Sequence, residues 1–466
     1  MNNILNLPIT TLSNLIRTGE ISPVALIEST FTEIDKHNPR LNAFTALCRE
    51  KSFEAAKQAE REIDDGQVRG ALHGIPVAIK DIIHVAGTPT GCGSKFFSVN
   101  PSQPDATVTA RLKAAGAIIV GKTNLHEFAY GVTSENPHFG ATPNPWDTSR
   151  VAGGSSGGSA AAVVAGFCSG ALGTDTGGSV RIPAAMCGAV GLKPTYGRIS
   201  VKSVVELAQS LDCVGPICRR VEDAAVMMNV LAGYDRGDVH SENHPVPDYI
   251  EALSDSVGGM RAGVPRQHCF ENLHSDVENN VAEAIEVLAK LGVEVVELDL
   301  PSITDAHEAT LTILMAEASH FHQRRLAENR ADFGLDVREI LENGQKFSAA
   351  DYVTAVRSRE HTRREFEKAF EAVDFILTPT VPVPAPLRSM LDTSDGSDSN
   401  LIRPRLTQNT RIFNLLGLPA ISVPCGLTKE GLPVGLQIVG RWWAEDELLR
   451  VAHAYEQATP WHTMHP

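Results

Sequence analysis

The chain has 466 residues, of which 42% are hydrophobic and 21% charged, proportions typical of a folded protein with a substantial core. The formal net charge of -15 argues against nucleic-acid binding as the main function, because phosphate recognition needs clustered Lys and Arg. The first residues contain no basic leader followed by an apolar core, and the longest apolar stretch, from Ala160, is interrupted at Gly166. We therefore expect a cytoplasmic protein with no membrane anchor and no nucleic-acid partner.

The segment from about 10 to 65 is predicted to be helical. In "ISPVALIESTFTEIDKHN", Ser22 is a candidate helix cap and Pro23 occupies the first helical position. From about residue 70, short apolar strands alternate with Ala-rich helices, in the order "IPVAIKDII", "DATVTARLKAAG" and "AIIVGKT". This alternation is typical of a sheet that helices cover on both faces.

The alternation resumes after about residue 260. A strand, a helix and a strand are predicted at "MRAGVPR", "DVENNVAEAIEVLAKLG" and "VEVVELDL", followed by a more purely helical region within about 300–410. Three apolar runs, "FILTPT", "AISVPCG" and "VGLQIVG", are predicted to be buried strands. The Pro-rich and then Asp- and Ser-rich segment 385–402 predicts a mobile surface loop. No repeat or clean linker divides the chain, so one domain over 1–466 is expected.

The eight cysteines include no Cys-x-x-Cys pair, so free buried thiols in a reducing compartment are expected. Cys213 and Cys218 leave a disulfide or a metal pair open. His320 and His322 do not share a helix face and predict no metal site.

The stretch "VAGGSSGGSAAAV", from Val151 to Val163, is dense in glycine and serine. It has no Gly-Lys-Ser/Thr ending, so it does not predict a phosphate loop. Gly153-x-Ser155-x-Gly157 matches the nucleophile elbow of α/β-hydrolases, but no apolar strand precedes it. "VAIK" resembles the ATP-pairing strand of protein kinases, yet no glycine-rich loop precedes it. All three interpretations are therefore disfavoured.

A second glycine-serine turn, "TDTGGS", spans Thr174 to Ser179. Backbone N–H groups in such a turn can converge on an oxyanion, and Asp175 and Arg181 could pair across it. A lysine can activate a serine hydroxyl if burial lowers its pKa, and Lys80 ends an apolar run. Local context alone also allows Lys80 to reach solvent or to pair with Asp81.

Taken together, these segments resemble the amidase signature family. The similarity includes "GIPVAIKD", "NPWDTSRVAGGSSGGSAAAVVAG", "GTDTGGSVRIPAAMCGAVGLKPTYGR" and "FNLLGLPAISVPCG", and it covers most of residues 5–460. The resemblance implies one large α/β domain in which a central mixed, mostly parallel twisted sheet is covered by helices on both faces. The signature core would extend over about 70–235, and the 300–410 region has no recognisable motif.

The same resemblance implies a catalytic set of Ser179 as nucleophile, Ser155 as bridging serine and Lys80 as base. The family's bridging serine lies 24 residues before the nucleophile, which selects Ser155 over Ser156, and the Gly154–Ser155 bond is expected to be cis. The remaining implied residues are the oxyanion-hole N–H groups of Thr176, Gly177, Gly178 and Ser179, the supporting residues Gly154, Asp175 and Arg181, and Thr133 in the substrate pocket. No metal or organic cofactor is implied.

We expect a stand-alone amide hydrolase that cleaves a small carboxamide through a seryl acyl-enzyme and releases ammonia or an amine, and that could assemble as a homo-oligomer. The alternative is the A subunit of a glutamyl-tRNA amidotransferase, which would act with partner subunits. Residues 333–355 favour the first, because they lack the Gly-Thr-Tyr-Ala-Leu segment of those amidotransferase chains. An inactive scaffold is disfavoured because Lys80, Ser155 and Ser179 are all present.

Overall fold

The computed structural model describes residues 4–300, 302–391 and 397–466, without the side chains of 397–401. In these ranges one eleven-stranded sheet has the order β1-β3-β2-β4-β6-β5-β10-β11-β9-β7-β8. The strands are β1 (Phe44–Leu47), β2 (Pro76–Lys80), β3 (Ile118–Thr123), β4 (Gly170–Asp175), β5 (Val190–Lys193), β6 (Cys213–Cys218), β7 (Arg261–Pro265), β8 (Glu294–Leu298), β9 (Phe375–Pro379), β10 (Ala420–Leu427) and β11 (Pro433–Gly440).

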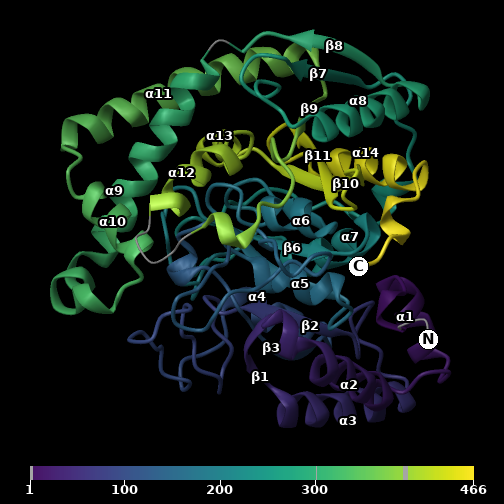
Figure 1. Cartoon of the computed structure of the whole chain (residues 1–466). Coiled ribbons are helices and arrows are strands. Elements are labelled where there is room, and N and C mark those ends of the chain that lie inside the picture. The colour runs from purple at the N-terminus through teal and green to yellow at the C-terminus, as the bar shows by residue number, and fades with distance from the viewer. Residues whose placement is uncertain (1–3, 301, 392–396) are drawn as a thin grey trace.

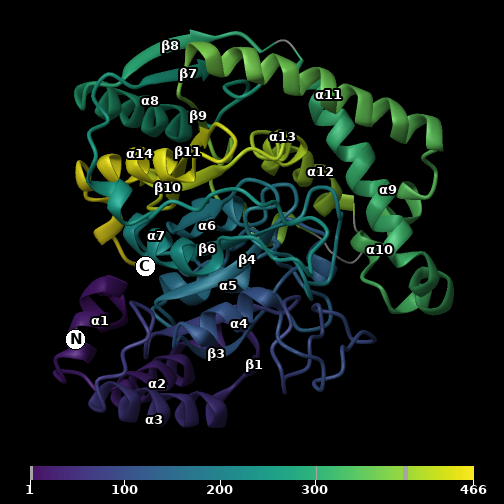
Figure 2. The ribbon, with the colours of Figure 1, turned by 180° about the vertical axis from the view of Figure 1, so that it is seen from behind.

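Helices flank this sheet (Figures 1 and 2). They are α1 (Ile9–Arg17), α2 (Pro23–Leu41), α3 (Arg49–Asp64), α4 (Thr107–Ala114), α5 (Gly157–Val164), α6 (Arg181–Cys187), α7 (Val221–Leu231), α8 (Ser275–Lys290), α9 (Ile303–Asn329), α10 (Leu335–Gly344), α11 (Ala349–Ala372), α12 (Ser397–Leu406), α13 (Arg411–Leu415) and α14 (Glu445–Gln457). The structure is thus a single α/β domain with a large mixed sheet, as expected.

The prediction that the sheet is mostly parallel is wrong. Of the ten pairings between neighbouring strands, β3–β2, β2–β4, β9–β7 and β7–β8 are parallel, and the others are antiparallel. Fully buried strands consist of continuous apolar runs in either direction, so such runs do not reveal strand polarity. A short turn joins β10 to β11 as an antiparallel hairpin, which helps to explain the difference.

The amino-terminal helices form largely as expected. The Ser22 hydroxyl accepts a hydrogen bond from the backbone N–H of Ala25 at 3.1 Å, and Pro23 begins α2. Such a cap satisfies one of the orphan N–H groups at a helix start. The prediction did not include β1, a four-residue strand that interrupts this helical segment and pairs with β3.

Helices α9, α10 and α11 form a lobe at one side of the molecule (Figure 1). They occupy the region predicted to be helical. Of the loop predicted over 385–402, residues 392–396 lie outside the described residues, and α12 begins at Ser397. None of the helices in the described ranges is both long and apolar enough to cross a membrane. All eight cysteines are free and buried, so Cys213 and Cys218 form no disulfide.

The strands β2 and β4 lie side by side and run parallel. All five residues of β2 and all six of β4 are buried, which is typical of strands covered on both faces. The carboxyl ends of parallel strands meet at the same edge of a sheet. Lys80, the last residue of β2, and Asp175, the last residue of β4, therefore lie at one edge, where the candidate site is built.

Candidate active site

Lys80 is fully buried, and its amine contacts two hydroxyl groups. Nζ lies 2.8 Å from Ser155 Oγ and 2.9 Å from Thr174 Oγ1. Burial lowers the pKa of Lys80 to about 7, although the carboxylates of Asp175 and Asp212 act in the opposite direction. A substantial share of this amine is therefore neutral near pH 7 and able to accept a proton.

The interpretation of Lys80 as a strand-end lysine that reaches solvent or pairs with Asp81 is excluded by this geometry. Asp81 instead forms a buried ion pair with Lys122, with 2.8 Å between Oδ1 and Nζ. The charge of Asp81 is thus matched by a different lysine. Lys80 remains directed at the serine.

The first glycine-serine turn holds Ser155 between two neighbouring segments. The peptide bond between Gly154 and Ser155 is cis. The Ser155 carbonyl accepts hydrogen bonds from the backbone N–H of His126 and the hydroxyl of Ser134, each at 3.2 Å. In the next residue, the Ser156 N–H donates to the carbonyl of Ser179 at 3.2 Å. The two glycine-serine turns therefore lie against each other, and Ser155 and Ser179 belong to one site.

The second turn is organised around Asp175. Its carboxylate accepts from the guanidinium of Arg181 at 2.9 and 3.0 Å and from the Asn414 amide at 2.9 Å. Burial alone would raise the pKa of Asp175, but the Arg181 charge and these hydrogen bonds hold it well below its usual value. Asp175 is therefore an ionised, fully buried anchor. Asn414, which contributes to it, lies in the segment "FNLLGLPAISVPCG" that resembles the amidase signature family, but it was not among the predicted site residues.

The predicted oxyanion-hole donors differ in whether their N–H groups already have a hydrogen-bond partner. The N–H of Gly178 donates to Asp175 Oδ1 at 2.8 Å, so it supports the turn and is not directed at a substrate. Gly178 is therefore not a candidate oxyanion donor, because its N–H already donates to Asp175. Thr176, Gly177 and Ser179 remain as candidate donors, and all three line a cavity.

This cavity has a volume of about 280 Å³. Ser179 lies on its wall and is 7% exposed. The other walls come from several parts of the chain, namely Ala129–Val132, Leu207, the α9 residues Thr310, Leu311, Leu314 and Met315, the α10 residues Ile340 and Asn343, and the residues Arg403, Pro404, Thr407 and Arg411. The lobe of α9 and α10 thus closes one side of the site.

Thr133, predicted to line the substrate pocket, is not on this lining. It is buried, and its hydroxyl lies 3.4 Å from His126 Nδ1. The preceding residues Gly131 and Val132 do line the cavity. The Thr133 hydroxyl is instead directed at the histidine, so this residue does not contribute to the described lining.

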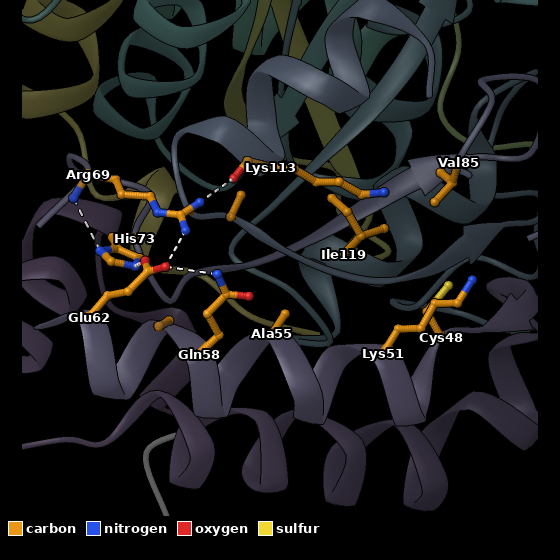
Figure 3. A pocket seen from close by; sticks show the side chains of 13 residues that line it. Cys48, Lys51, Ala55, Gln58, Glu62, Arg69, His73, Val85, Lys113 and Ile119 are labelled. Carbon is orange, nitrogen blue, oxygen red and sulfur yellow. Dashed lines mark hydrogen bonds and ion pairs between the residues drawn. The ribbon is translucent and has the colours of Figure 1, made fainter. Parts of the chain in front are cut away.

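A second cavity of about 240 Å³ lies between α3 and β3 (Figure 3). Several of its polar groups already have partners. Glu62 Oε1 accepts from Gln58 at 2.8 Å and from the guanidinium of Arg69, and Glu62 Oε2 lies 3.1 Å from His73 Nε2. Among the described residues, no activated hydroxyl lies on this lining, so we place the chemistry in the cavity that contains Ser179.

The arrangement of a buried lysine, two serines and a backbone turn is accompanied by a match over nearly the whole chain. A family model described as amidase matches residues 25–449. The chain therefore belongs to the amidase family, a class of enzymes that hydrolyse amides.

Two relatives are components of a larger enzyme. The A subunit of glutamyl-tRNA(Gln) amidotransferase from Syntrophobacter fumaroxidans is 42% identical, over 98% of this chain and 97% of that protein. The corresponding protein of Thermodesulfovibrio yellowstonii is 41% identical over 99% of both. A crystal structure of the A subunit from Thermotoga maritima is 35% identical with a TM-score of 0.83, covering 100% of this chain and 98% of that one.

Another solved structure has a similar fold at lower identity. A chain from a vestigial protein complex, described as revealing the evolutionary origins of an s-triazine catabolic enzyme, has a TM-score of 0.91 at 30% identity. The alignment covers 97% of this chain and 98% of that chain.

These relatives correct the function expected from the sequence. The stand-alone hydrolase was favoured because residues 333–355 lack a segment of the amidotransferase chains. Curated relatives at about 40% identity over the whole length are nevertheless named as the A subunit of the amidotransferase. The absence of one short segment is weaker evidence than similarity across the chain, so the alternative is the better supported interpretation.

Proposed function

We propose that this chain is the glutamine-hydrolysing A subunit of a glutamyl-tRNA amidotransferase, with Ser179 as nucleophile, Ser155 as proton relay and Lys80 as base. The observation that carries the proposal is the contact of 2.8 Å between the Lys80 amine and the Ser155 hydroxyl, beside the turn of Ser179. The names of the full-length relatives supply the substrate and the complex.

The first half of the reaction forms an acyl-enzyme. Neutral Lys80 accepts the proton of Ser155, which accepts that of Ser179, and Ser179 Oγ forms a bond to the side-chain amide carbon of glutamine. The developing oxyanion is stabilised by backbone N–H groups of Thr176, Gly177 and Ser179. When the C–N bond breaks, Ser155 returns a proton to the nitrogen, and ammonia leaves.

The second half restores the enzyme. Water attacks the glutamyl ester, its proton passes through Ser155 to Lys80, and the relay then protonates Ser179 as glutamate is released. The balance is glutamine and water to glutamate and ammonia. A serine suits the bridging position because its hydroxyl can donate and accept at the same time.

Ammonia release from glutamine, measured with and without the partner subunits of the Syntrophobacter complex, tests this proposal. We expect glutamine hydrolysis that the partner subunits increase, and we expect hydroxylamine to trap glutamyl hydroxamate from the wild-type enzyme. Ser179→Ala should lose at least about 1,000-fold in kcat, as expected for loss of a nucleophile. Ser149→Ala, at an exposed serine, is the matched control and should retain wild-type activity.

Two results would reject the proposal. One is hydroxamate formation that persists in Ser179→Ala, which would assign the nucleophile elsewhere. The other is an enzyme that releases no ammonia from glutamine in the presence or absence of partner subunits.

A further inference from the structure

Three polar atoms on the wall of the Ser179 cavity have no hydrogen-bond partner among the described residues. They are Tyr130 Oη, Arg403 Nε and Arg411 Nη1. Tyr130 is 4% exposed and Arg411 is 3% exposed, so bulk water solvates neither freely. Buried polar groups are nearly always paired in folded proteins, so three unpaired donors on one cavity wall indicate a ligand that accepts hydrogen bonds.

The charge of this wall is also unbalanced. Within the described part of the chain, no aspartate or glutamate lines the cavity, although two guanidinium groups do. Asp336 is the carboxylate whose charge acts on Arg403, and it is hydrogen-bonded to His126 at 2.7 Å. Burial and the charge of Arg403 lower the pKa of Arg411 to about 9, so Arg411 is still a cation at neutral pH. A buried cation without a counter-ion is unfavourable, and an anionic ligand would relieve this.

The same wall is anchored to the catalytic turn. The hydroxyl of Thr410 donates to the carbonyl of Gly177 at 2.7 Å. A Cβ placed on Gly177 would lie 3.8 Å from Arg411 Cβ, so the stem of this arginine packs beside the turn that precedes Ser179. A short carbon chain can therefore join an amide at Ser179 to an anion at Arg411. Leu311, Leu314 and Met315, which also line this cavity, suit such a chain.

We propose that Arg403 and Arg411, together with the hydroxyl of Tyr130, bind the carboxylate of the substrate, and that the site accepts ω-amides of short carboxylic acids whether or not they carry an α-ammonium group. Because a guanidinium presents its donors in a planar fork, it matches the two oxygens of a carboxylate. The described lining offers no carboxylate to an ammonium group, so the ammonium of glutamine is tolerated and not required. This inference rests on the proposed amide hydrolysis by Ser179.

Glutamine, glutaramate and pentanamide differ in their charged groups, so their rates of hydrolysis separate the contribution of the carboxylate from that of the ammonium group. Glutaramate has the carboxylate and the terminal amide of glutamine but no ammonium, and pentanamide is a neutral amide of the same length. We expect kcat/KM for ammonia release from glutaramate to be at least equal to that for glutamine and about 100-fold above that for pentanamide, as a charge-assisted bidentate contact allows.

Substitutions of the two arginines test whether these residues bind the carboxylate. Arg411→Gln and Arg403→Gln should each lower kcat/KM for glutaramate by about 10- to 100-fold and leave pentanamide within about threefold. Arg405→Gln is the matched control, because Arg405 lies on α12 with Arg403 but does not line this cavity. A loss of pentanamide hydrolysis equal to the loss for glutaramate would show a structural role and overturn the inference.

Binding to an inactive enzyme makes this test independent of turnover. Calorimetric titration of glutaramate into Ser179→Ala should give measurable binding that the second substitution Arg411→Gln abolishes. If glutaramate binds Ser179→Ala no better than pentanamide does, the carboxylate site is refuted even if glutamine is hydrolysed. If glutaramate binds through Arg411 while no amide is ever hydrolysed, the proposed function fails and the carboxylate site stands.

Discussion

The role of base that we propose for Lys80 depends on the surroundings of its amine, and not on any property of the residue itself. An exposed lysine has a pKa of about 10.4 and is almost fully protonated at neutral pH. Full burial beside two neutral hydroxyl groups lowers the pKa of Lys80 to about 7, while Asp175 and Asp212 limit the shift. The same amine can therefore accept a proton and return it within one catalytic cycle.

The proposed role of Lys80 makes the activity depend on pH. Only neutral Lys80 can accept the proton of Ser155, so kcat/KM for glutamine should rise with pH through a midpoint near 7 and level off above about pH 8. Initial rates between pH 5 and 9 measure this profile. Lys80→Arg keeps a positive charge that does not dissociate in this range, and its residual activity should show no such rise.

A neighbouring carboxylate provides the control for this profile. The charge of Asp212 raises the pKa of Lys80, and burial raises the pKa of Asp212 itself to about 6. Asp212→Asn removes that charge and should move the midpoint of the profile to lower pH by up to about one unit. A midpoint that stays in place would show that Lys80 is not the group that titrates.

Residue types alone could not settle these roles. The position of Lys80 at the end of an apolar strand was visible in the sequence, but the pairing of Asp81 with Lys122 was not, because these residues are far apart in the chain. The family resemblance selected Ser155 and Ser179. Tyr130, Arg403 and Arg411 were not singled out by any motif, so only the three-dimensional structure brings them together with Ser179.

Among the elements, α5 is tightly constrained near the site. Its second residue, Gly158, lies against the backbone of two other segments. A Cβ at this position would be 2.4 Å from the Asn124 carbonyl oxygen and 2.6 Å from that of Ala43. Backbone atoms cannot move aside as a flexible side chain can. The glycine therefore allows α5 to pack directly against neighbouring chain segments.

The close contacts of Gly158 predict how a substitution in α5 changes the stability of the protein. Gly158→Ala should lower the free energy of unfolding by about 2 to 3 kcal/mol, within the range measured for overpacked cores. Chemical denaturation measures the change. Gly258→Ala is the matched control, since its Cβ would find no atom nearer than 3.4 Å, and it should alter stability by less than about 0.5 kcal/mol. Equal stabilities of the two variants would contradict the packing argument.

The alternation of strands and helices was predictable because periodicity is a local property of the sequence. Strand direction was not, because it depends on which distant strand becomes the neighbour. β4 illustrates this, since it is parallel to β2 on one side and antiparallel to β6 on the other. Both neighbouring strands pair with the same apolar residues of β4, so the composition of β4 does not reveal which neighbour is parallel to it.

At the scale of the whole molecule, the two ends of the chain meet at a pair of buried acids. The Asp223 carboxylate on α7 accepts from the N–H of Ile9 at the start of α1, at 2.6 Å. Glu456 on α14 accepts from the N–H of Val221 at 2.9 Å. Burial raises the pKa of Asp223 to about 7 and that of Glu456 to about 8. Elements that are far apart in the chain are therefore joined through carboxyl groups that favour the protonated state.

This pair predicts how stability depends on pH. A carboxyl group whose pKa is higher in the folded state binds more protons when folded, so its stabilising contribution is present at low pH and is lost as pH rises from about 4.5 to 8. Glu456→Gln remains neutral and keeps an acceptor for Val221. At pH 9 its free energy of unfolding should exceed that of the wild type by about 1 to 3 kcal/mol.

Thermal or urea unfolding at pH 5 and pH 9 measures this difference. At pH 5 the variant and the wild type should be nearly equal, because Glu456 is already protonated. Glu54→Gln changes an exposed glutamate on α3 and should show no such pH-dependent gain. A variant that is less stable at both pH values would show that Glu456 is ionised in the folded protein.

The anchor of the second glycine-serine turn is completed late in the synthesis of the chain. Asp175 and Arg181 are translated early, but Asn414 and Gln437 complete their hydrogen bonds, with Asn414 2.9 Å from Asp175 and Gln437 2.7 Å from Arg181. A chain still on the ribosome lacks these partners even after its lysine and both serines have emerged. The turn that carries Ser179 therefore lacks part of its anchor until β11 has been synthesised, and a nascent chain that stops before Gln437 is expected to lack the proposed activity.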